Sequence, residues 1–432
     1  MLNIERQHQY LLEPDFLNYI FAPLFETQKA ALAVSGGPDS MALMHLAARF
    51  AAQQDQDIEL VVLTVDHGLR PEAAEEAQLV QRAAQALGLA CSILTPDAFA
   101  PTSRIQESAR EVRYQLMQNK MQELDLTQLF TAHHLDDQAE TFFMRLARGS
   151  GLSGLGAMGR SSVAFGLDII RPFLDLPKAD LVSFLDAEQI TYVVDPSNND
   201  EKFERVRWRQ ALKGLQRLGL QTKNIGLSTR RLRRADAALN AVAEGVYSER
   251  FFIDPFGCVL FDHALIKSEP AEIGVRLLVR ALDDAGGASA APDLAKVEAL
   301  YDLLCMGQLH LRGQTLGGCG IRGHGALIQV FREVGRLNDQ PLSLEPGESL
   351  IWDDRFKIIL AADAPASVQV QPAMAMTRAK FDQLLPDLSF VPMEAVRAAP
   401  VVTSGDEILA LGEHVLGPNI DVFRIFGPNA LS

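Results

Sequence analysis

The sequence has few cysteines, and none of them is paired with another at short spacing. The chain carries only Cys91, Cys258, Cys305 and Cys319, with no C-x-x-C motif. Neither a disulfide framework nor a zinc knuckle is therefore indicated, and we expect all four to be reduced and structural. The same lack disfavours chemistry on a cysteine-bound iron–sulfur cluster.

Long apolar runs and an excess of positive charge are also missing. No uninterrupted apolar stretch approaches the roughly 18 residues of a membrane span, and Met1–Arg6 does not begin a basic segment followed by an apolar one. We therefore expect a cytoplasmic protein without a membrane segment. The net charge of −15 argues against general affinity for nucleic acids or acidic membranes. A local basic face remains compatible with it.

Apolar periodicity predicts an α/β fold for the first half of the chain. At 432 residues, two or three domains are expected. After a helical lead-in to about residue 28, strands and helices alternate at the spacing of βαβ units, which predicts a doubly wound parallel sheet. Strands are expected at 30–34, 58–65, 90–94, 128–132, 168–172 and 190–194, and helices at 40–53, 72–87, 103–124, 136–147 and 177–188. Residues 235–306 look helical, and strand patterns dominate from 309 onward.

A glycine loop follows the first predicted strand. The apolar run ends in Ser35-Gly-Gly-Pro-Asp-Ser40 and resumes as a helix. Unpaired amides and the positive end of a helix dipole bind anions well, so phosphate is the expected ligand. The loop lacks the lysine of G-x-x-x-x-G-K-[ST]. It offers instead the carboxylate of Asp39 for a magnesium ion and the hydroxyl of Ser40 for a phosphate oxygen.

Polar clusters also follow two other predicted strands. They are Asp66-His-Gly-Leu-Arg70 and His133-His-Leu-Asp-Asp137. Each cluster alone could be a turn or a helix cap. Because ligands bind at the carboxyl ends of parallel strands, the two clusters and the glycine loop together predict one site.

Charged side chains on two predicted helices could complete this site. Asp136, Asp137 and Glu140 lie within one turn, where they would bind a cation or an amine, or would only satisfy the helix dipole. Arg110 and Arg113 are three residues apart and could bind phosphate or could lie on a solvated face.

Two later segments bear on substrate binding. Glycines at 149, 151, 154, 156 and 159 predict a mobile loop at the rim of the site. Between Lys202 and Arg234 eleven basic residues stand against one acid, Glu204. Such a density predicts contact with a nucleic acid, whereas a solvated helix usually mixes both signs.

These motifs resemble one family. Ser35-Gly-Gly-x-Asp-Ser40 is similar to the PP-loop of the N-type ATP pyrophosphatases. Together with five further motifs it resembles tRNA(Ile)-lysidine synthetases over roughly residues 28–215. The further motifs are Asp66-His-Gly-Leu-Arg70, Ala109-Arg-x-x-Arg-Tyr114, Thr131-Ala-His-His-x-Asp-Asp-Gln-Ala-Glu-Thr141, Arg148-Gly-Ser-Gly-x-x-Gly154 and Asp195-Pro-Ser-Asn198.

The resemblance implies an adenine nucleotide alpha hydrolase-like fold and a reaction. ATP would activate carbon 2 of the wobble cytidine in the CAU anticodon of a tRNA(Ile), and the amine of free lysine would displace AMP. It implies catalytic roles for Asp39, Arg110, Arg113, Asp137 and Glu140, with Mg²⁺ on Asp39. It implies nucleotide contacts at Ser35, Gly36, Gly37, Pro38, Asp39, Ser40, Asp66, His67 and His133, and tRNA contacts at Arg205, Arg207 and Arg209.

The expected domains are a PP-loop catalytic domain over 1–215, a mainly helical tRNA-binding domain over 216–335 and a small α+β domain over 336–432 that also binds tRNA. A homodimer is compatible with the sequence. Val206 stands where the family usually has asparagine, which puts that asparagine's hydrogen bond in doubt. The alternatives are a tRNA thiolase, an ammonia-using synthetase, and an inert RNA-binding protein on the same scaffold.

Overall fold

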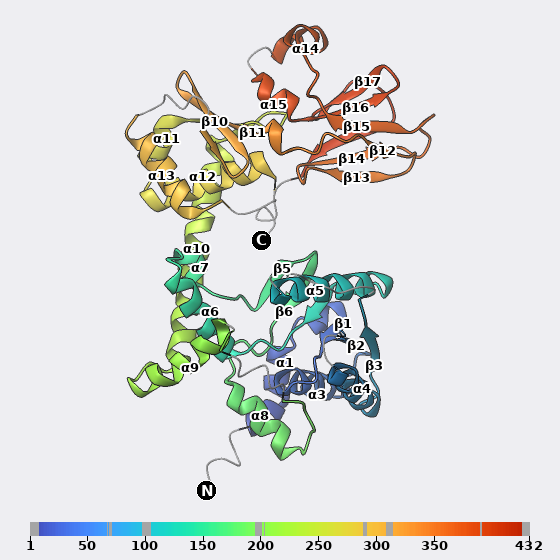
Figure 1. The fold of residues 1–432 in the computed structure, drawn as a ribbon, viewed down its shortest axis with the longest axis vertical. Coiled ribbons are helices and arrows are strands. Elements are labelled where there is room, and N and C mark those ends of the chain that lie inside the picture. Colours follow the sequence, from blue (N-terminus) through green and yellow to red (C-terminus); the bar gives the residue numbers. More distant parts are fainter. Residues whose placement is uncertain are drawn as a thin grey trace. The chain divides into compact units, whose positions relative to one another are not determined.

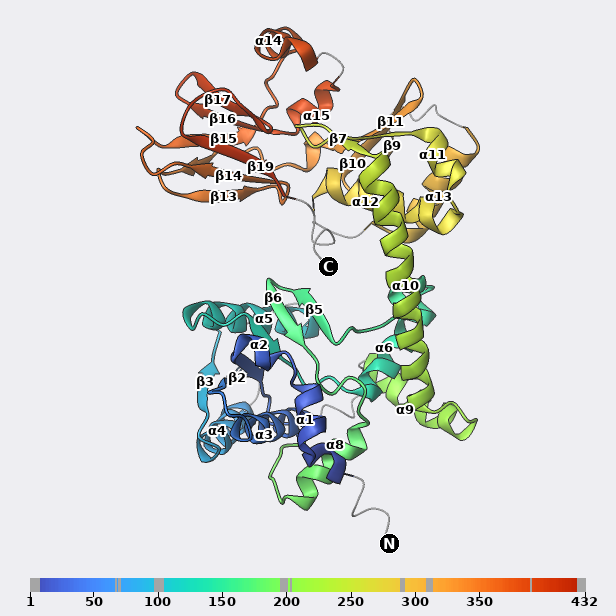
Figure 2. The same ribbon diagram turned by 180° about the vertical axis from the view of Figure 1, so that it is seen from behind.

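The computed structural model describes residues 8–66, 68, 71–96, 105–194, 201–202, 204–287, 292–307, 314–388 and 391–425. The chain divides into two compact units, Met1–Asp236 and Ala237–Ser432. The boundary between them falls inside the long helix α10 (Thr222–Arg250), which Figures 1 and 2 show from opposite sides. The division into three domains stays a prediction.

The first unit is built on one six-stranded sheet in the order β3-β2-β1-β4-β6-β5. All neighbouring strands are parallel except the β5–β6 pair. The strands are β1 (Lys29–Ala33), β2 (Glu59–Val65), β3 (Ala90–Leu94), β4 (Gln128–Phe130), β5 (Ser161–Ala164) and β6 (Leu167–Ile170). The helices are η1 (Gln9–Leu12), α1 (Pro14–Ile20), α2 (Leu24–Thr27), α3 (Pro38–Ala52), α4 (Pro71–Ala86), α5 (Ile105–Glu123), α6 (Leu135–Ala147), α7 (Leu152–Leu155), α8 (Lys178–Ala187) and α9 (Glu204–Arg217).

Helices cover both faces of this sheet, as its apolar strands require. Side chains alternate between two hydrophobic clusters: Leu32 of β1 belongs to the cluster that includes residues of α1, α3, α4 and α8, whereas Ala31 belongs to the cluster that includes residues of α5. Parallel strands buried on both faces read as continuous apolar runs in the sequence. The predicted doubly wound α/β fold is therefore confirmed.

The order of the strands fixes where a ligand can bind. From β1 the chain builds β2 and β3 on one side and then crosses to β4 and β6 on the other. The order reverses between β1 and β4, and the carboxyl ends at such a point frame a crevice. The loops that follow these two strands, starting at Val34 and Thr131, carry the predicted motifs.

One local prediction in the first unit is wrong, and one strand was missed. Residues 190–194 form no strand, and their backbone bonds to a loop instead: the amide of Val193 donates to the carbonyl of Gly36 at 2.9 Å. The strand β5 was not predicted. It closes a hairpin with β6 through Phe165 and Gly166, which both have positive φ.

The second unit contains antiparallel sheets and short helices. Its sheets have the orders β7-β8-β11-β10-β9, β12-β15-β16-β17-β18 and β13-β14-β19. The strands are β7 (Phe252–Ile253), β8 (Val259–Asp262), β9 (Gln314–Leu316), β10 (Cys319–His324), β11 (Leu327–Arg332), β12 (Leu342–Leu344), β13 (Ser349–Trp352), β14 (Phe356–Leu360), β15 (Val368–Pro372), β16 (Pro400–Ser404), β17 (Glu407–Leu411), β18 (His414–Val415) and β19 (Ile420–Arg424). The helices are α11 (His263–Ser268), α12 (Ala271–Gly286), α13 (Leu294–Cys305), η3 (Val334–Arg336), α14 (Arg378–Leu384), η4 (Pro386–Leu388) and α15 (Met393–Arg397).

The helical pattern predicted for 235–306 corresponds to the end of α10 and to α11, α12 and α13. The short strands β7 and β8 in the same stretch were not predicted. A short apolar run such as Val259–Phe261 in β8 has no period that separates strand from helix. In the described part of the chain, no helix combines the length and the apolar character needed to cross a bilayer.

Candidate active site

The PP-loop (residues 35–40) connects the end of β1 to α3. Gly36 has a φ of +84°, which a residue with a side chain rarely adopts, and Gly37 is the N-cap of α3. Pro38 occupies the first helical position, where no amide hydrogen is needed. The next amides, those of Asp39 and Ser40, lie in the first turn, which leaves them without carbonyl partners in the helix. This end of α3 is therefore suited to bind an anion.

The side chain of Ser40 holds the loop in shape. Its hydroxyl donates to the carbonyl of Gly37 at 3.0 Å and accepts from the amide of Ser35 at 3.1 Å. The two serine hydroxyls are 3.3 Å apart. Because Ser40 is buried and its only hydroxyl hydrogen is used, a bond from it to a phosphate would need that hydrogen to turn away from Gly37.

A pocket of about 390 Å³ lies where the loops after β1 and β4 meet. It brings together most of the residues predicted from the sequence, which come from the loops after β1 and β4 and from α3, α5, α6 and α9. The predicted residues that line it are Ser35, Gly37, Pro38, Asp39, Ser40, Arg110, Arg113, His133, Asp137, Arg205 and Arg209.

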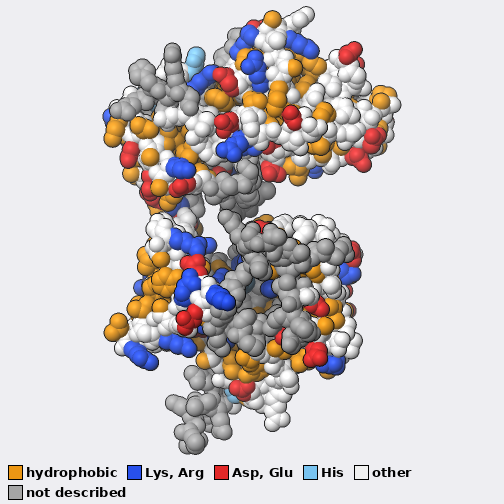
Figure 3. Space-filling model, in the orientation of Figure 1, with side chains coloured by type: hydrophobic (Ala, Val, Ile, Leu, Met, Phe, Trp, Pro, Cys, Tyr) orange, Lys and Arg blue, Asp and Glu red, His pale blue; other side chains and the backbone are white. Residues whose placement is uncertain are grey.

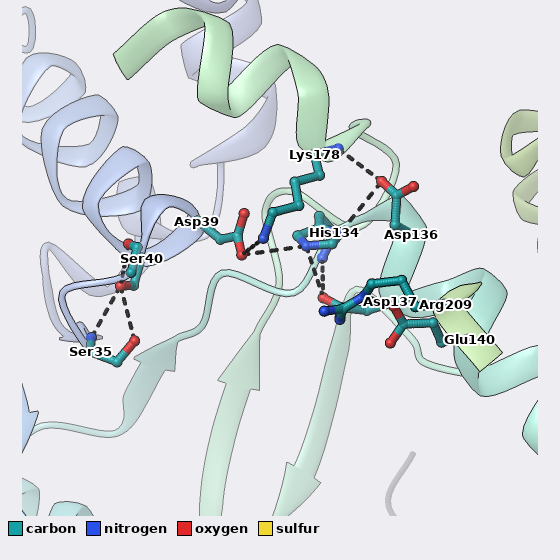
Figure 4. A network of polar contacts seen from close by, with 10 residues as sticks. Ser35, Asp39, Ser40, His134, Asp136, Asp137, Glu140, Lys178 and Arg209 are labelled. Carbon is teal, nitrogen blue, oxygen red and sulfur yellow. Dashed lines mark hydrogen bonds and ion pairs between the residues drawn. The ribbon is translucent and has the colours of Figure 1, made fainter. Parts of the chain in front are cut away.

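Asp39 is the centre of a charged network on one side of this pocket (Figure 4). Its Oδ2 lies 2.7 Å from Nζ of Lys178 and 3.5 Å from Nε2 of His134. The same imidazole nitrogen is 3.6 Å from Oδ2 of Asp137, and Nδ1 is 3.7 Å from Oδ2 of Asp136. The other oxygen of Asp39, Oδ1, is buried and has no hydrogen-bond partner.

The ionisation of these groups follows from their contacts. Burial raises the pKa of Asp39 and of Asp137, but the neighbouring cations, His134 above all, outweigh it and hold both values below the ordinary range. Burial acts to lower the pKa of His134, which is only 3% exposed, yet Asp137 and Asp39 raise it above the ordinary value. Asp39 and Asp137 are therefore carboxylates, and their charges favour the protonated form of His134.

The other histidine of the motif behaves differently. Burial lowers the pKa of His133 to about 4, and the charges of Arg171, Arg110 and Arg205 act in the same direction, although Asp137 opposes them. Its Nδ1 lies 3.0 Å from the hydroxyl of Thr131. His133 is thus neutral at physiological pH and can serve as a hydrogen-bonding group.

Glu140 lies behind the pocket rather than on its surface. It is 1% exposed, and its Oε1 accepts from Nε of Arg209 at 2.7 Å, while Oε2 is buried without a partner. Burial raises the pKa of Glu140, and Arg209 opposes that effect only in part. Arg209 itself lines the pocket, so Glu140 acts on the site partly through this arginine.

The remaining predicted residues are placed outside the pocket lining. The carbonyl of Gly36 accepts a hydrogen bond from the amide of Val193. Oδ1 of Asp66 accepts a hydrogen bond from the amide of Gly68 at 2.8 Å. Nη1 of Arg207 donates hydrogen bonds to the carbonyls of residues 201 and 202. His67 lies outside the described residues.

Sequence reasoning missed Lys178 and His134 as members of the site. His134 was part of the recognised motif, and its place at the start of α6 could have drawn attention to it. Lys178 offered no local signal, since it lies 139 residues from Asp39 and reaches it only through the fold. Tyr114, which also lines the pocket, stacks on Phe165 at 4.5 Å and lies beneath Arg110.

The glycine-rich segment 149–159 is held by hydrogen bonds rather than free. It contains α7, and Nη1 of Arg145 donates to two of its carbonyls. Gln138 bonds both the amide and the carbonyl of Met158, and Arg233 donates to the same carbonyl. The loop predicted here thus contains one short helix, and three long side chains from α6 and α10 bind its backbone. Its mobility stays a prediction.

The arrangement of charges defines what the pocket can do. The start of α3 and four arginines line it, which suits a polyanion such as a polyphosphate. Asp137 presents an ionised carboxylate to the same cavity, which suits an ammonium group. A nucleoside triphosphate and an amine could therefore meet in one pocket.

Comparison with known proteins agrees with these features. Residues 2–215 match the family model of the PP-loop domain. The chain is 39% identical to the tRNA(Ile)-lysidine synthase of Bradyrhizobium sp. (strain BTAi1 / ATCC BAA-1182) over 76% of this chain and 95% of that protein. It is 35% identical to the enzyme of the same name from Ruegeria pomeroyi, with coverages of 92% and 91%, and 31% identical to that of Wolbachia pipientis wMel, with 92% of each chain covered. The chain belongs to the tRNA(Ile)-lysidine synthase family, whose members are ligases that form a carbon–nitrogen bond.

Proposed function

We propose that this protein uses ATP to attach lysine to carbon 2 of the wobble cytidine of a tRNA(Ile) with a CAU anticodon. The observation that carries the proposal is a single pocket holding both the PP-loop and the carboxylate of Asp137. Family membership supports the tRNA substrate. Modification of tRNA would place the enzyme in the cytoplasm.

The reaction would occur in two steps. The oxygen on carbon 2 of cytidine attacks the α-phosphorus of ATP, so that an O–P bond forms and the bond to pyrophosphate breaks. The lysine amine then attacks carbon 2, a C–N bond forms, and AMP leaves with that oxygen. The amine must lose a proton, which requires a base near the nucleophile.

The PP-loop would bind the polyphosphate of ATP. The amides of Gly37, Asp39 and Ser40 lie at the helix end that favours anions. Arg110 and Arg113 line the same cavity and would neutralise the charge that develops on the departing pyrophosphate. The neutral His133 would hydrogen-bond the nucleotide or the cytidine.

A magnesium ion fits beside this loop. The buried Oδ1 of Asp39 has no partner, and carboxylate oxygens are ligands that Mg²⁺ prefers. Within the described residues no group of three or more His, Cys, Asp and Glu side chains could hold a metal. Magnesium needs only one or two carboxylates when phosphate oxygens supply other ligands. Bound there, it would neutralise polyphosphate charge.

Asp137 would bind the lysine amine. It lines the pocket, and its pKa is held low, so the side chain is a carboxylate that attracts an ammonium group. Glu140 lies deeper and contacts Arg209, and its raised pKa makes it the better acceptor of a proton. We therefore assign amine binding to Asp137 and a supporting role to Glu140.

Exposed basic side chains on α9 and the start of α10 would bind the tRNA backbone. Figure 3 shows Lys and Arg side chains on the face where α9 lies. Arg209 and Arg233 are engaged inside the first unit, by Glu140 and by backbone carbonyls. The exposed members are Arg205, Arg207, Lys213, Arg217, Lys223, Arg230, Arg231 and Arg234. We assign further tRNA contacts to residues 216–335 and 336–432.

Neutralising Lys213 and Arg217 together should weaken tRNA binding more at low salt than at high salt. Each lost phosphate contact is expected to lower the slope of log affinity against log salt by about 0.7 to 0.9. Titration of labelled tRNA at several salt concentrations measures the slope. The matched control is Lys29→Gln with Lys120→Gln, which changes the total charge equally elsewhere in the unit. Equal slopes in both double variants would contradict the assignment.

The decisive experiment is transfer of radiolabelled lysine to RNA. Label should enter a tRNA with a CAU anticodon only when ATP is present, and AMP and pyrophosphate should be released. A tRNA whose wobble base is uridine serves as the control. Absence of label in the CAU tRNA would refute the proposal.

Sulfur transfer is the alternative within the same fold class, and the pocket gives it no support. None of the described residues that line the pocket is a cysteine. Cys258 and Cys319 are buried in the second unit, where burial raises the pKa of both thiols. A thiol with a raised pKa is a poor nucleophile.

A further inference from the structure

Lys178 is a pocket residue to which neither the motifs nor the proposed reaction gives a role. It is the first residue of α8, and its side chain is 39% exposed on the pocket wall. Nζ donates to Oδ2 of Asp39 at 2.7 Å. This ammonium thus neutralises the carboxylate to which we assign magnesium.

The backbone of Lys178 is firmly held. Its amide donates to Oδ2 of Asp136 at 2.9 Å. One and two turns further along α8, the side chains of Leu181 and Phe184 are buried in the core beside the sheet. Asp180 accepts a hydrogen bond from the hydroxyl of Tyr10 at 2.6 Å. The four-carbon side chain can therefore move its ammonium while the helix stays in place.

A divalent cation on Asp39 would disturb this ion pair. Two positive charges a few ångströms apart repel strongly in a partly buried site. The ammonium is the most mobile of these groups, and the strongest new acceptors within the cavity would be polyphosphate oxygens.

We propose that Lys178 is a polyphosphate-binding residue: its ammonium neutralises Asp39 before nucleotide binds and moves to the β- and γ-phosphate oxygens when ATP and magnesium arrive. The inference rests on the proposed use of ATP. Residues 35–40 contain no basic side chain, so the PP-loop itself cannot form an ion pair with the phosphates. Lys178, which lies outside the loop, would supply that ion pair.

The test compares Lys178→Gln with the wild type in equilibrium binding of ATP, pyrophosphate and AMP, all with Mg²⁺. Loss of a charge-assisted contact should weaken ATP and pyrophosphate about tenfold or more. AMP has no β- or γ-phosphate, so its affinity should change less than about twofold. Lys178→Arg should keep part of the ATP affinity. Lys120→Gln, which removes an ammonium paired with Glu123 on α5, is the control.

A second arm repeats the ATP measurement with EDTA. Without the metal no cation competes with the ammonium for Asp39, so the ion pair should persist. The loss of ATP affinity caused by Lys178→Gln should therefore be severalfold smaller. An equal loss with and without Mg²⁺, an equal loss for ATP and AMP, or no loss at all would each overturn the proposal.

These readouts need neither tRNA nor lysine. If lysine transfer fails while Lys178→Gln selectively weakens ATP, the lysidine proposal falls and the role of Lys178 stands. A wild-type protein that binds neither ATP nor pyrophosphate would overturn both.

Discussion

Replacing Asp39 by asparagine is expected to slow lysine transfer by at least about a hundredfold, while the affinity for tRNA changes less than about twofold. The asparagine has the same size but no charge, so it can neither bind a magnesium ion firmly nor balance Lys178 and His134. Losses of this size are usual when one preorganised electrostatic contact to a transition state is removed. Steady-state transfer of labelled lysine and filter binding of tRNA measure the two quantities.

The control for this variant is Asp125→Asn, a change of the same kind at an exposed side chain paired with Lys29. Asp125 has a φ of 51°, a conformation that asparagine adopts readily, so the control should fold normally. If Asp39→Asn lowered the affinity for tRNA by the same factor as the rate of lysine transfer, Asp39 would support the fold or the tRNA site. It would then not be a residue of the ATP site.

Most of the first unit could be predicted because its pattern is local. The helix expected at 103–124 is α5, Ile105–Glu123, and the strand expected at 58–65 is β2, Glu59–Val65. Apolar runs and turn residues act within a few positions, so periodicity finds them. Residues 190–194 have the same apolar character. They lack a neighbouring strand, however, and only the fold reveals that they support the PP-loop.

The site was predictable as a set of motifs but not as a set of contacts. The positions of Asp39 and Asp137 after two predicted strands indicate that they lie near one another, because parallel strands bring their carboxyl ends together. Nothing local indicates that Lys178 reaches Asp39 or that Arg209 is bound by Glu140. Arg209 illustrates the limit: a run of basic residues predicted a tRNA contact, and the structure gives this member a buried carboxylate as its partner.

Replacing Asp137 by asparagine should impair the second step of the reaction more than the first. The carboxylate lines the pocket and is ionised, so its loss removes the attraction that holds the lysine ammonium near the reacting carbon. Positioning and charge effects of this kind are worth about a hundredfold or more. We expect lysine transfer to fall by that factor. Release of pyrophosphate from ATP with tRNA alone should fall by less than about tenfold.

The isosteric change Glu140→Gln provides the comparison. Glutamine keeps an oxygen that can accept the hydrogen bond from Arg209, so the wall of the pocket should persist and the loss of transfer should be smaller than for Asp137→Asn. Asparagine at 137 can still accept from the amide of His134, which now donates to Asp137 Oδ2 at 3.0 Å, so the start of α6 should remain capped. If Asp137→Asn slowed lysine transfer and pyrophosphate release by the same factor, Asp137 would organise the ATP site through His134. Amine binding would then have to be assigned to Glu140, and the larger effect of Glu140→Gln on the lysine KM would reveal it.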